Sequence, residues 1–167
     1  MSVIEFVPRN SPTQEFVRCE DVSLHVFATV QIQAEIRRVL YALSTPEYME
    51  AWLQLPETER IECYPDQGSF DRFRIDLFAC GNRRGCIYGS CLLSKPDKIT
   101  YLWERDPSEG RPKSIVEVRL WGGHGCCTLK LEHGIFRSQA EAQWHSAMWN
   151  NSLRKLCRIT EGIGIAR

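Results

Sequence analysis

The sequence predicts one α+β domain in which a curved antiparallel sheet wraps around a long C-terminal helix. Three observations lead to this fold class. An alternating strand at 22–32 runs directly into two short helical segments, strands and turns follow from about Arg60, and one isolated amphipathic helix spans roughly 138–160. Strands at short spacing with helices at both ends are typical of an antiparallel α+β fold. The sheet must bury one face, so we expect the last helix to cover it, with a cavity between the two.

Two different periodicities define the first elements. Apolar residues alternate along 22–32, which predicts a half-buried strand. Apolar residues at i, i+3, i+4 and i+7 over 36–43 then predict a helix. The segment Ser44-Thr45-Pro46-Glu47 starts a second short helix that carries Trp52. Either its first and last residues form a capping box, or the threonine is the cap and the proline takes the first helical position.

The middle of the chain reads as a run of strands. Period-two patterns predict strands at 72–79, 99–103, 116–120 and 127–133, and the strand at 86–93 has no clear facing. Glycine, proline and polar clusters predict turns or loops at 81–85, 95–98, 106–112 and 122–125. In the last strand Cys127, Leu129, Leu131 and His133 share one face.

A second capping-box pattern begins the C-terminal helix. Ser138 and Glu141 form that pattern, and Trp149, Leu153 and Leu156 at i, i+4 and i+7 define the buried stripe. We therefore divide the chain into a partly ordered extension at 1–21, a single domain at 22–160 and a tail at 161–167.

Composition restricts the class of protein. The 167 residues carry 21 Lys and Arg and 21 Asp and Glu, so the net charge is zero, which argues against nucleic acid or an anionic membrane as partner. No signal-like start or membrane-length apolar run occurs, and we expect a cytoplasmic protein with reduced thiols. The 8 cysteines form no C-x-x-C pair, so no metal site and no cofactor is expected.

Motifs for phosphate binding, dinucleotide binding, nucleophilic serine and zinc peptidase chemistry do not occur. Acid–base chemistry could come from His133, Tyr88, Tyr101 or Glu104, and His133 is the best single catalytic candidate. A lone histidine at the end of an apolar strand face is, however, more often a hydrogen-bonded core residue.

The aromatic side chains allow two interpretations, plain core or the lining of an apolar cavity. The expected ligand-binding residues come from the second short helix, the strands and the last helix: Trp52, Phe73, Tyr88, Tyr101, Trp103, His133, Trp149 and Leu153.

Four stretches together resemble the SRPBCC superfamily, the helix-grip fold of START domains, polyketide cyclases and the birch-pollen allergen. They are LSTPEY at 43–48 leading to Trp52-Leu53, Gly89 to ITYLW at 99–103, TLKLEHGIF at 128–136, and Trp149 with Leu153 and Leu156. The chain is most similar to the branch homologous to the C-terminal domain of the activator of heat-shock protein 90 ATPase. The resemblance implies a helix-grip fold with a hydrophobic cavity and no fixed catalytic residues. Met148 stands where that branch usually has glycine.

Three functions follow as hypotheses. The first is a module that binds a small hydrophobic or amphipathic molecule in the cavity without a reaction. The second is an enzyme of cyclase, aromatase or hydrolase type that uses the same cavity. The third is a chaperone-interaction module. A monomer and a homodimer are both compatible with the sequence, since an open sheet leaves edge strands.

Overall fold

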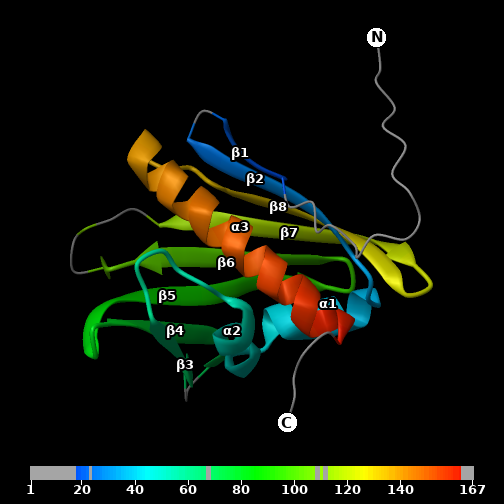
Figure 1. Ribbon diagram of the computed structural model, residues 1–167, viewed down its shortest axis with the longest axis horizontal. Helices are drawn as coiled ribbons and strands as arrows, with labels where there is room; N and C mark the ends of the chain where they lie inside the picture. The colour runs from blue at the N-terminus through cyan, green and yellow to red at the C-terminus, as the bar shows by residue number, and fades with distance from the viewer. Residues whose placement is uncertain (1–17, 23, 67–68, 108–109, 111–112, 163–167) are drawn as a thin grey trace.

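One antiparallel sheet and three helices form the described part of the chain, which comprises residues 18–22, 24–66, 69–107, 110 and 113–162 of a computed structural model (Figure 1). In these residues eight strands pair in the order β1-β2-β8-β7-β6-β5-β4-β3, each pair antiparallel. The strands are β1 Arg18–Val22, β2 His25–Ile32, β3 Arg60–Asp66, β4 Ser69–Ala79, β5 Asn82–Lys95, β6 Lys98–Arg105, β7 Ser114–Gly123 and β8 Cys126–Gly134. The helices are α1 Ile36–Ser44, α2 Pro46–Trp52 and α3 Gln139–Glu161.

The long helix α3 lies across one face of the sheet, and α1 and α2 lie beside its C-terminal half (Figure 1). It contacts β1, β2, α1 and α2. We call the covered face the inner face and the opposite one the outer face. Two short helices between strands, followed by strands and a final long helix against a curved sheet, make up a helix-grip arrangement. The predicted fold class is therefore confirmed.

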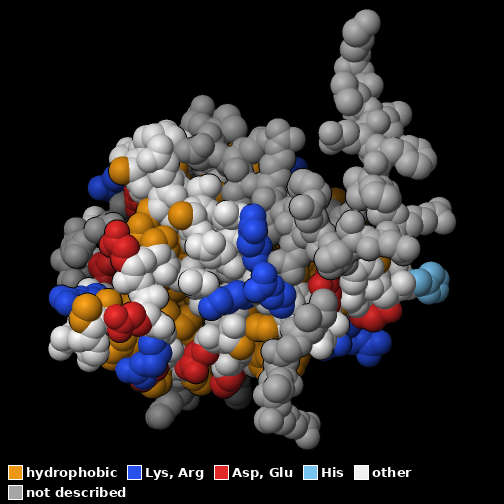
Figure 2. Space-filling model, in the orientation of Figure 1, with side chains coloured by type: hydrophobic (Ala, Val, Ile, Leu, Met, Phe, Trp, Pro, Cys, Tyr) orange, Lys and Arg blue, Asp and Glu red, His pale blue; other side chains and the backbone are white. Residues whose placement is uncertain are grey.

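Surface charge matches the neutral composition. Lys and Arg lie among Asp and Glu on the side of the molecule that carries α3, with hydrophobic side chains between them (Figure 2). None of the helices in the described residues is long and apolar enough to cross a membrane.

The beginning of the sheet differs from the prediction. The sequence predicted one strand that starts at Val22, whereas β1 and β2 form a hairpin with Val22 opposite His25. Leu24 turns the chain with a φ of 71°, a conformation that glycine, asparagine or aspartate usually supplies. The turn therefore has no sequence signature. Residues 18–21 belong to the sheet rather than to an extension, and the rest of the predicted extension, 1–17, lies outside the described residues.

Two predicted turns are shorter than expected. The segment predicted as a turn at 81–85 contains only the end of a tight turn, since Ala79 pairs with Asn82. Cys80 and Gly81 have φ values of 51° and 72°, as in the two-residue hairpin turns that fit the twist of a sheet. β5 consequently begins at Asn82. At the other end of the sheet, Gly123 pairs with Cys126, so the turn is also only two residues long.

The helix ends follow the predicted capping signals in part. Thr45 precedes α2 without a side-chain cap bond, and Pro46 takes the first helical position. This is the second of the two predicted alternatives. For α3, Ser138 Oγ accepts a hydrogen bond from the Glu141 backbone N–H at 3.2 Å. The Glu141 carboxylate accepts from the backbone N–H of Arg137 rather than from that of Ser138.

Alternation along the strands decides which residues face α3. On β6, Ile99, Tyr101 and Trp103 are buried on the inner face, as predicted. The facing of β5 is now clear, since Ile87 and Gly89 are buried. A side-chain carbon at Gly89 would overlap the Phe73 ring on β4. The absence of a side chain at Gly89 therefore allows an aromatic ring to lie flat over the centre of the sheet.

Candidate functional site

The predicted ligand-binding residues separate into two groups. The seven on the inner side are at most 5% exposed: Trp52, Phe73, Tyr101, Trp103, His133, Trp149 and Leu153. Tyr88 is 42% exposed and lies on the outer face, because its neighbours Ile87 and Gly89 face inward. The inner seven come from α2, β4, β6, β8 and α3, so only the tertiary fold brings them together.

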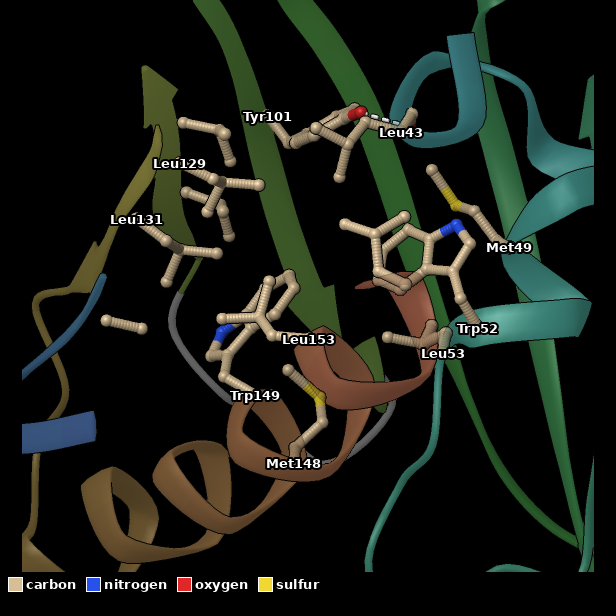
Figure 3. Close-up of a cluster of buried hydrophobic side chains, with 14 of the residues drawn as sticks. Leu43, Met49, Trp52, Leu53, Tyr101, Leu129, Leu131, Met148, Trp149 and Leu153 are labelled. Atoms are coloured by element: carbon tan, nitrogen blue, oxygen red, sulfur yellow. Dashed lines mark hydrogen bonds between the residues drawn. The ribbon is translucent and has the colours of Figure 1, made fainter. Parts of the chain in front are cut away.

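Three indoles occupy the layer between sheet and helix. Trp149 of α3 stacks on Trp52 of α2 with ring centroids 6.4 Å apart, and it packs against Trp103 of β6 at 6.1 Å. Trp52 and Trp149 point into this layer from their two helices (Figure 3). One of the two interpretations of the sequence was that Trp103 and Trp149 line an apolar cavity. They contact each other instead, so the indoles themselves fill this part of the layer.

His133 is held between Trp149 and Ser114 of β7. The Trp149 Nε1–H donates to His133 Nδ1 at 2.9 Å, and Ser114 Oγ lies 2.8 Å from His133 Nε2. Since Nδ1 accepts, the proton is assigned to Nε2, which donates to Ser114 Oγ. The Ser114 hydroxyl then donates to the Trp103 carbonyl at 3.4 Å. This chain satisfies both ring nitrogens with protein groups.

Burial keeps His133 neutral. The residue is fully buried, and this desolvation, followed by the nearby His145, moves the pKa of His133 well below its ordinary value. The two imidazole rings lie 4.7 Å apart, and Phe136 stacks on His145 at 4.4 Å. A proton carrier needs a free nitrogen near its substrate. His133 instead holds Trp149 of α3 against β7 and β8.

Trp103 differs from the other two indoles. Trp52 Nε1 donates to the Ala42 carbonyl at 2.9 Å, and Trp149 Nε1 donates to His133. Trp103 is 3% exposed, and its Nε1–H is buried with no hydrogen-bond partner in the described residues. Tyr101, two residues earlier on the same face, donates its hydroxyl to the Leu43 carbonyl (Figure 3). Among these four buried donors, Trp103 Nε1–H is thus the one without a hydrogen-bond partner in the described residues.

The outer face carries a separate groove of about 960 Å³. It runs over a row of residues paired across four strands, Tyr64, Arg74, Tyr88 and Glu104. The Arg74 guanidinium lies 5.1 Å from the centre of the Tyr64 ring, and Lys113 lies 3.5 Å from Glu104. The sequence analysis missed this groove because it left the facing of β5 open. The alternation of Arg72, Arg74 and Asp76 on β4 was a signal for a polar outer face.

Potential metal ligands and two buried thiols are further features of the described residues. These residues contain no group of three His, Cys, Asp or Glu side chains placed to hold a metal ion. Burial is the main cause that raises the pKa of Cys63 to about 12 and that of Cys127 to about 11, so these thiols stay protonated and unreactive near neutral pH. Cys127 faces inward and its neighbour Cys126 does not, as strand alternation predicts.

The sequence matches no protein-family model and no curated protein. Solved structures do share the fold. A protein of Chromobacterium violaceum superposes with a TM-score of 0.71 at 17% identity, over 84% of this chain and 99% of that one. CalU16 of Micromonospora echinospora has a TM-score of 0.56 at 19% identity, over 93% and 88%. DynU16, a protein in the dynemicin biosynthetic locus, has a TM-score of 0.61 at 21% identity, over 83% of this chain and 47% of that chain. At these identities the likeness shows the helix-grip fold alone.

Proposed function

We propose that the protein binds a small hydrophobic or amphipathic ligand between the inner face of the sheet and α3, with no reaction assigned. The observation that supports this best is the buried Trp103 Nε1–H without a partner in the described residues. Leaving a buried donor unsatisfied costs about 1–3 kcal/mol, and native proteins keep few such groups. A ligand that accepts a hydrogen bond there removes this cost on binding.

Room for the ligand has to come from side chains that move. Met148 precedes Trp149 on α3 and is fully buried. Its unbranched thioether can adopt other rotamers more easily than the rings around it. Where the resembling branch usually has glycine, this chain has methionine, so the Met148 side chain takes up volume there. We therefore expect Met148→Ala to strengthen ligand binding while it lowers the stability of the free protein.

The test compares one variant on the inner face with the same change elsewhere. Native mass spectrometry of gently purified protein should reveal a bound small molecule, and a thermal-shift screen of apolar compounds should raise the melting temperature. Trp103→Phe should weaken both signals. Trp121→Phe alters an indole that is 49% exposed on β7 and should leave them unchanged. Full retention of binding by Trp103→Phe, or no ligand in either assay, would contradict the proposal.

An enzyme that uses the same layer has less support. Its best base, His133, has no solvent exposure, and both of its nitrogens bind protein groups. Release of His133 would require Trp149 and Ser114 to give up their hydrogen bonds. We accordingly keep ligand binding without a reaction as the proposed function.

A chaperone-interaction role is the second candidate, and the outer face is the observation that favours it. Tyr64, Tyr88 and Ile115 are each 40% or more exposed there. The two tyrosines line the groove, and Ile115 is paired with Leu102, which also lines it. The four sequence stretches also lead us to propose a place in the branch related to the activator of heat-shock protein 90 ATPase. Titration of purified heat-shock protein 90 with the wild type and with Tyr88→Ala tests both ideas. Equal affinities, or no binding, would count against this role.

A further inference from the structure

We infer that the ligand is electrically neutral and presents a single oxygen acceptor to the Nε1–H of Trp103. This inference rests on the proposed function and narrows it, because it names the chemical class that the inner layer accepts. It depends on two features of the layer: its charges and its hydrogen-bond donors.

Among the described residues, the side chains that are buried on the inner face include no carboxylate, lysine or arginine, and the charged Arg105 lies only partly buried at its edge. The buried polar side chains on that side belong to Ser114, His133, His145, Ser152 and Thr160. Asp76, the one buried carboxylate in the described part of the chain, faces outward and pairs with Arg74 and Arg83, each at 2.9 Å. A carboxylate or ammonium placed next to Trp103 would be buried without a counter-charge, which is strongly unfavourable.

Three neighbours, Arg105, His133 and His145, could in principle supply a positive charge, and each is already engaged. His145 stacks on Phe136 and binds the Glu141 carbonyl through Nδ1. Arg105 follows Trp103 by two residues on β6. Its guanidinium lies 3.8 Å from the Trp144 ring centre, and its Nε lies 3.4 Å from the Asp106 carboxylate. His133 binds Trp149 and Ser114, and its burial disfavours protonation. An anionic ligand would therefore have to break an existing contact in order to gain one.

The donors of the layer define the acceptor. The indole of Trp52, the indole of Trp149 and the hydroxyl of Tyr101 each donate to a protein group. Among these buried donors Trp103 Nε1–H is the one without a partner in the described residues, and an indole nitrogen can only donate. Its complement is a ketone, ether or similar oxygen on an otherwise apolar body. Sites with a buried unpaired donor discriminate against analogues that lack the acceptor.

Three probes of matched size test the inference by isothermal titration calorimetry. They are 2-acetylnaphthalene, which is neutral with one acceptor, 2-isopropylnaphthalene, which has no acceptor, and 2-naphthoate, which is anionic. We expect the ketone to bind roughly 2- to 13-fold more tightly than the hydrocarbon, the effect of one hydrogen bond worth about 0.5–1.5 kcal/mol. The carboxylate should bind more weakly than either. Trp103→Phe should equalise the ketone and the hydrocarbon, whereas Trp121→Phe should keep the difference.

If Trp103→Phe does not fold, an NMR measurement on the wild type tests the same inference without the variant. The indole N–H resonance of Trp103 should move downfield when the ketone binds and much less when the hydrocarbon binds. Tightest binding of 2-naphthoate, or the same preference in Trp103→Phe as in the wild type, would overturn the inference and leave ligand binding standing. If none of the three probes binds, the proposed function fails and the inference fails with it.

Discussion

Strands β4, β5 and β6 carry two faces built on different chemistry. The inner face holds Phe73, Tyr101 and Trp103, all nearly buried and packed against helices. The outer face of the same strands holds Arg74 and Glu104 in ion pairs beside exposed rings. Packing and buried hydrogen bonds stabilise the first face, and exchange with solvent weakens the polar contacts of the second. A change of equal size should therefore cost far more on the inner face, and the following predictions test this.

The largest effect is expected where the inner face and α3 meet. Trp149→Ala removes the ring that packs on Trp52 and Trp103, and it leaves His133 Nδ1 without its donor. We expect a loss of about 3–5 kcal/mol in the free energy of unfolding, measured by urea denaturation. Tyr88→Ala on the outer face should change it by only about 0.5 kcal/mol. Similar losses in the two variants would remove the contrast between the faces.

The next effect comes from overpacking the centre of the sheet. Gly89→Ala places a methyl group against the Phe73 ring, which is itself buried and packed edge-on to Tyr101. We expect a loss of about 1–3 kcal/mol in urea denaturation. Gly123→Ala is the matched control, because a side-chain carbon there meets open space. Phe73→Leu combined with Gly89→Ala should recover part of the loss in a double-mutant cycle, and strict additivity would disprove the proposed overlap.

The pH dependence of stability should report the buried imidazole. Burial and His145 lower the pKa of His133 in the folded state, so the unfolded chain takes up the proton first as pH falls. The free energy of unfolding should therefore decrease below about pH 6.5, the ordinary histidine pKa, and keep its full His133 contribution above it. His133→Asn should flatten this decrease relative to the wild type. His124→Asn, in an exposed turn, should not, and an identical slope in all three proteins would refute the assignment.

The smallest effect belongs to an ion-pair cluster on the outer face. Glu117 lies 2.5 Å from Lys98 and 2.7 Å from Arg119, and hydrogen bonds from these two groups lower its pKa. The contribution of Glu117 to the free energy of unfolding is present above the ordinary glutamate pKa, and it is lost as the pH falls through the lowered pKa. Glu117→Gln should cost only about 0–1 kcal/mol at neutral pH, and 1 M salt should abolish the difference. A large, salt-independent loss would show that the outer face also depends on buried contacts.

Much of the fold could be predicted because local patterns and tertiary structure agree. Alternation on β6 and β8 identified the inner face, and the stripe on α3 identified the helix that covers it. The hairpin of β1 and β2 was missed because Leu24 adopts a backbone conformation that its side chain does not signal. Tyr88 was misplaced because Gly89 offers no hydrophobicity to mark the inward direction of β5.

The sequence predicted most of the residues of the candidate site, but it did not predict the contacts between them. Six of its residues were recognised as aromatic or histidine side chains on elements expected to face one another. Ser114 and His145 were not, because a serine at a strand start and a histidine on a helix have no distinctive pattern. Their roles depend on distances between β7, β8 and α3, and local sequence patterns carry no information about these distances.

The sequence alone determined which face of each strand is apolar and which stripe of the last helix is buried, since these follow from the periods of strand and helix. It could not decide which of Trp52, Trp103 and Trp149 has a hydrogen-bond partner for its indole N–H, because each partner lies on another element or farther along the chain. Only the tertiary structure shows that the Trp52 indole donates a hydrogen bond to a carbonyl and the Trp149 indole to an imidazole. It leaves the Trp103 indole N–H without an acceptor in the described residues. The reason is geometric, because a hydrogen bond depends on a few tenths of an ångström between elements far apart in the chain.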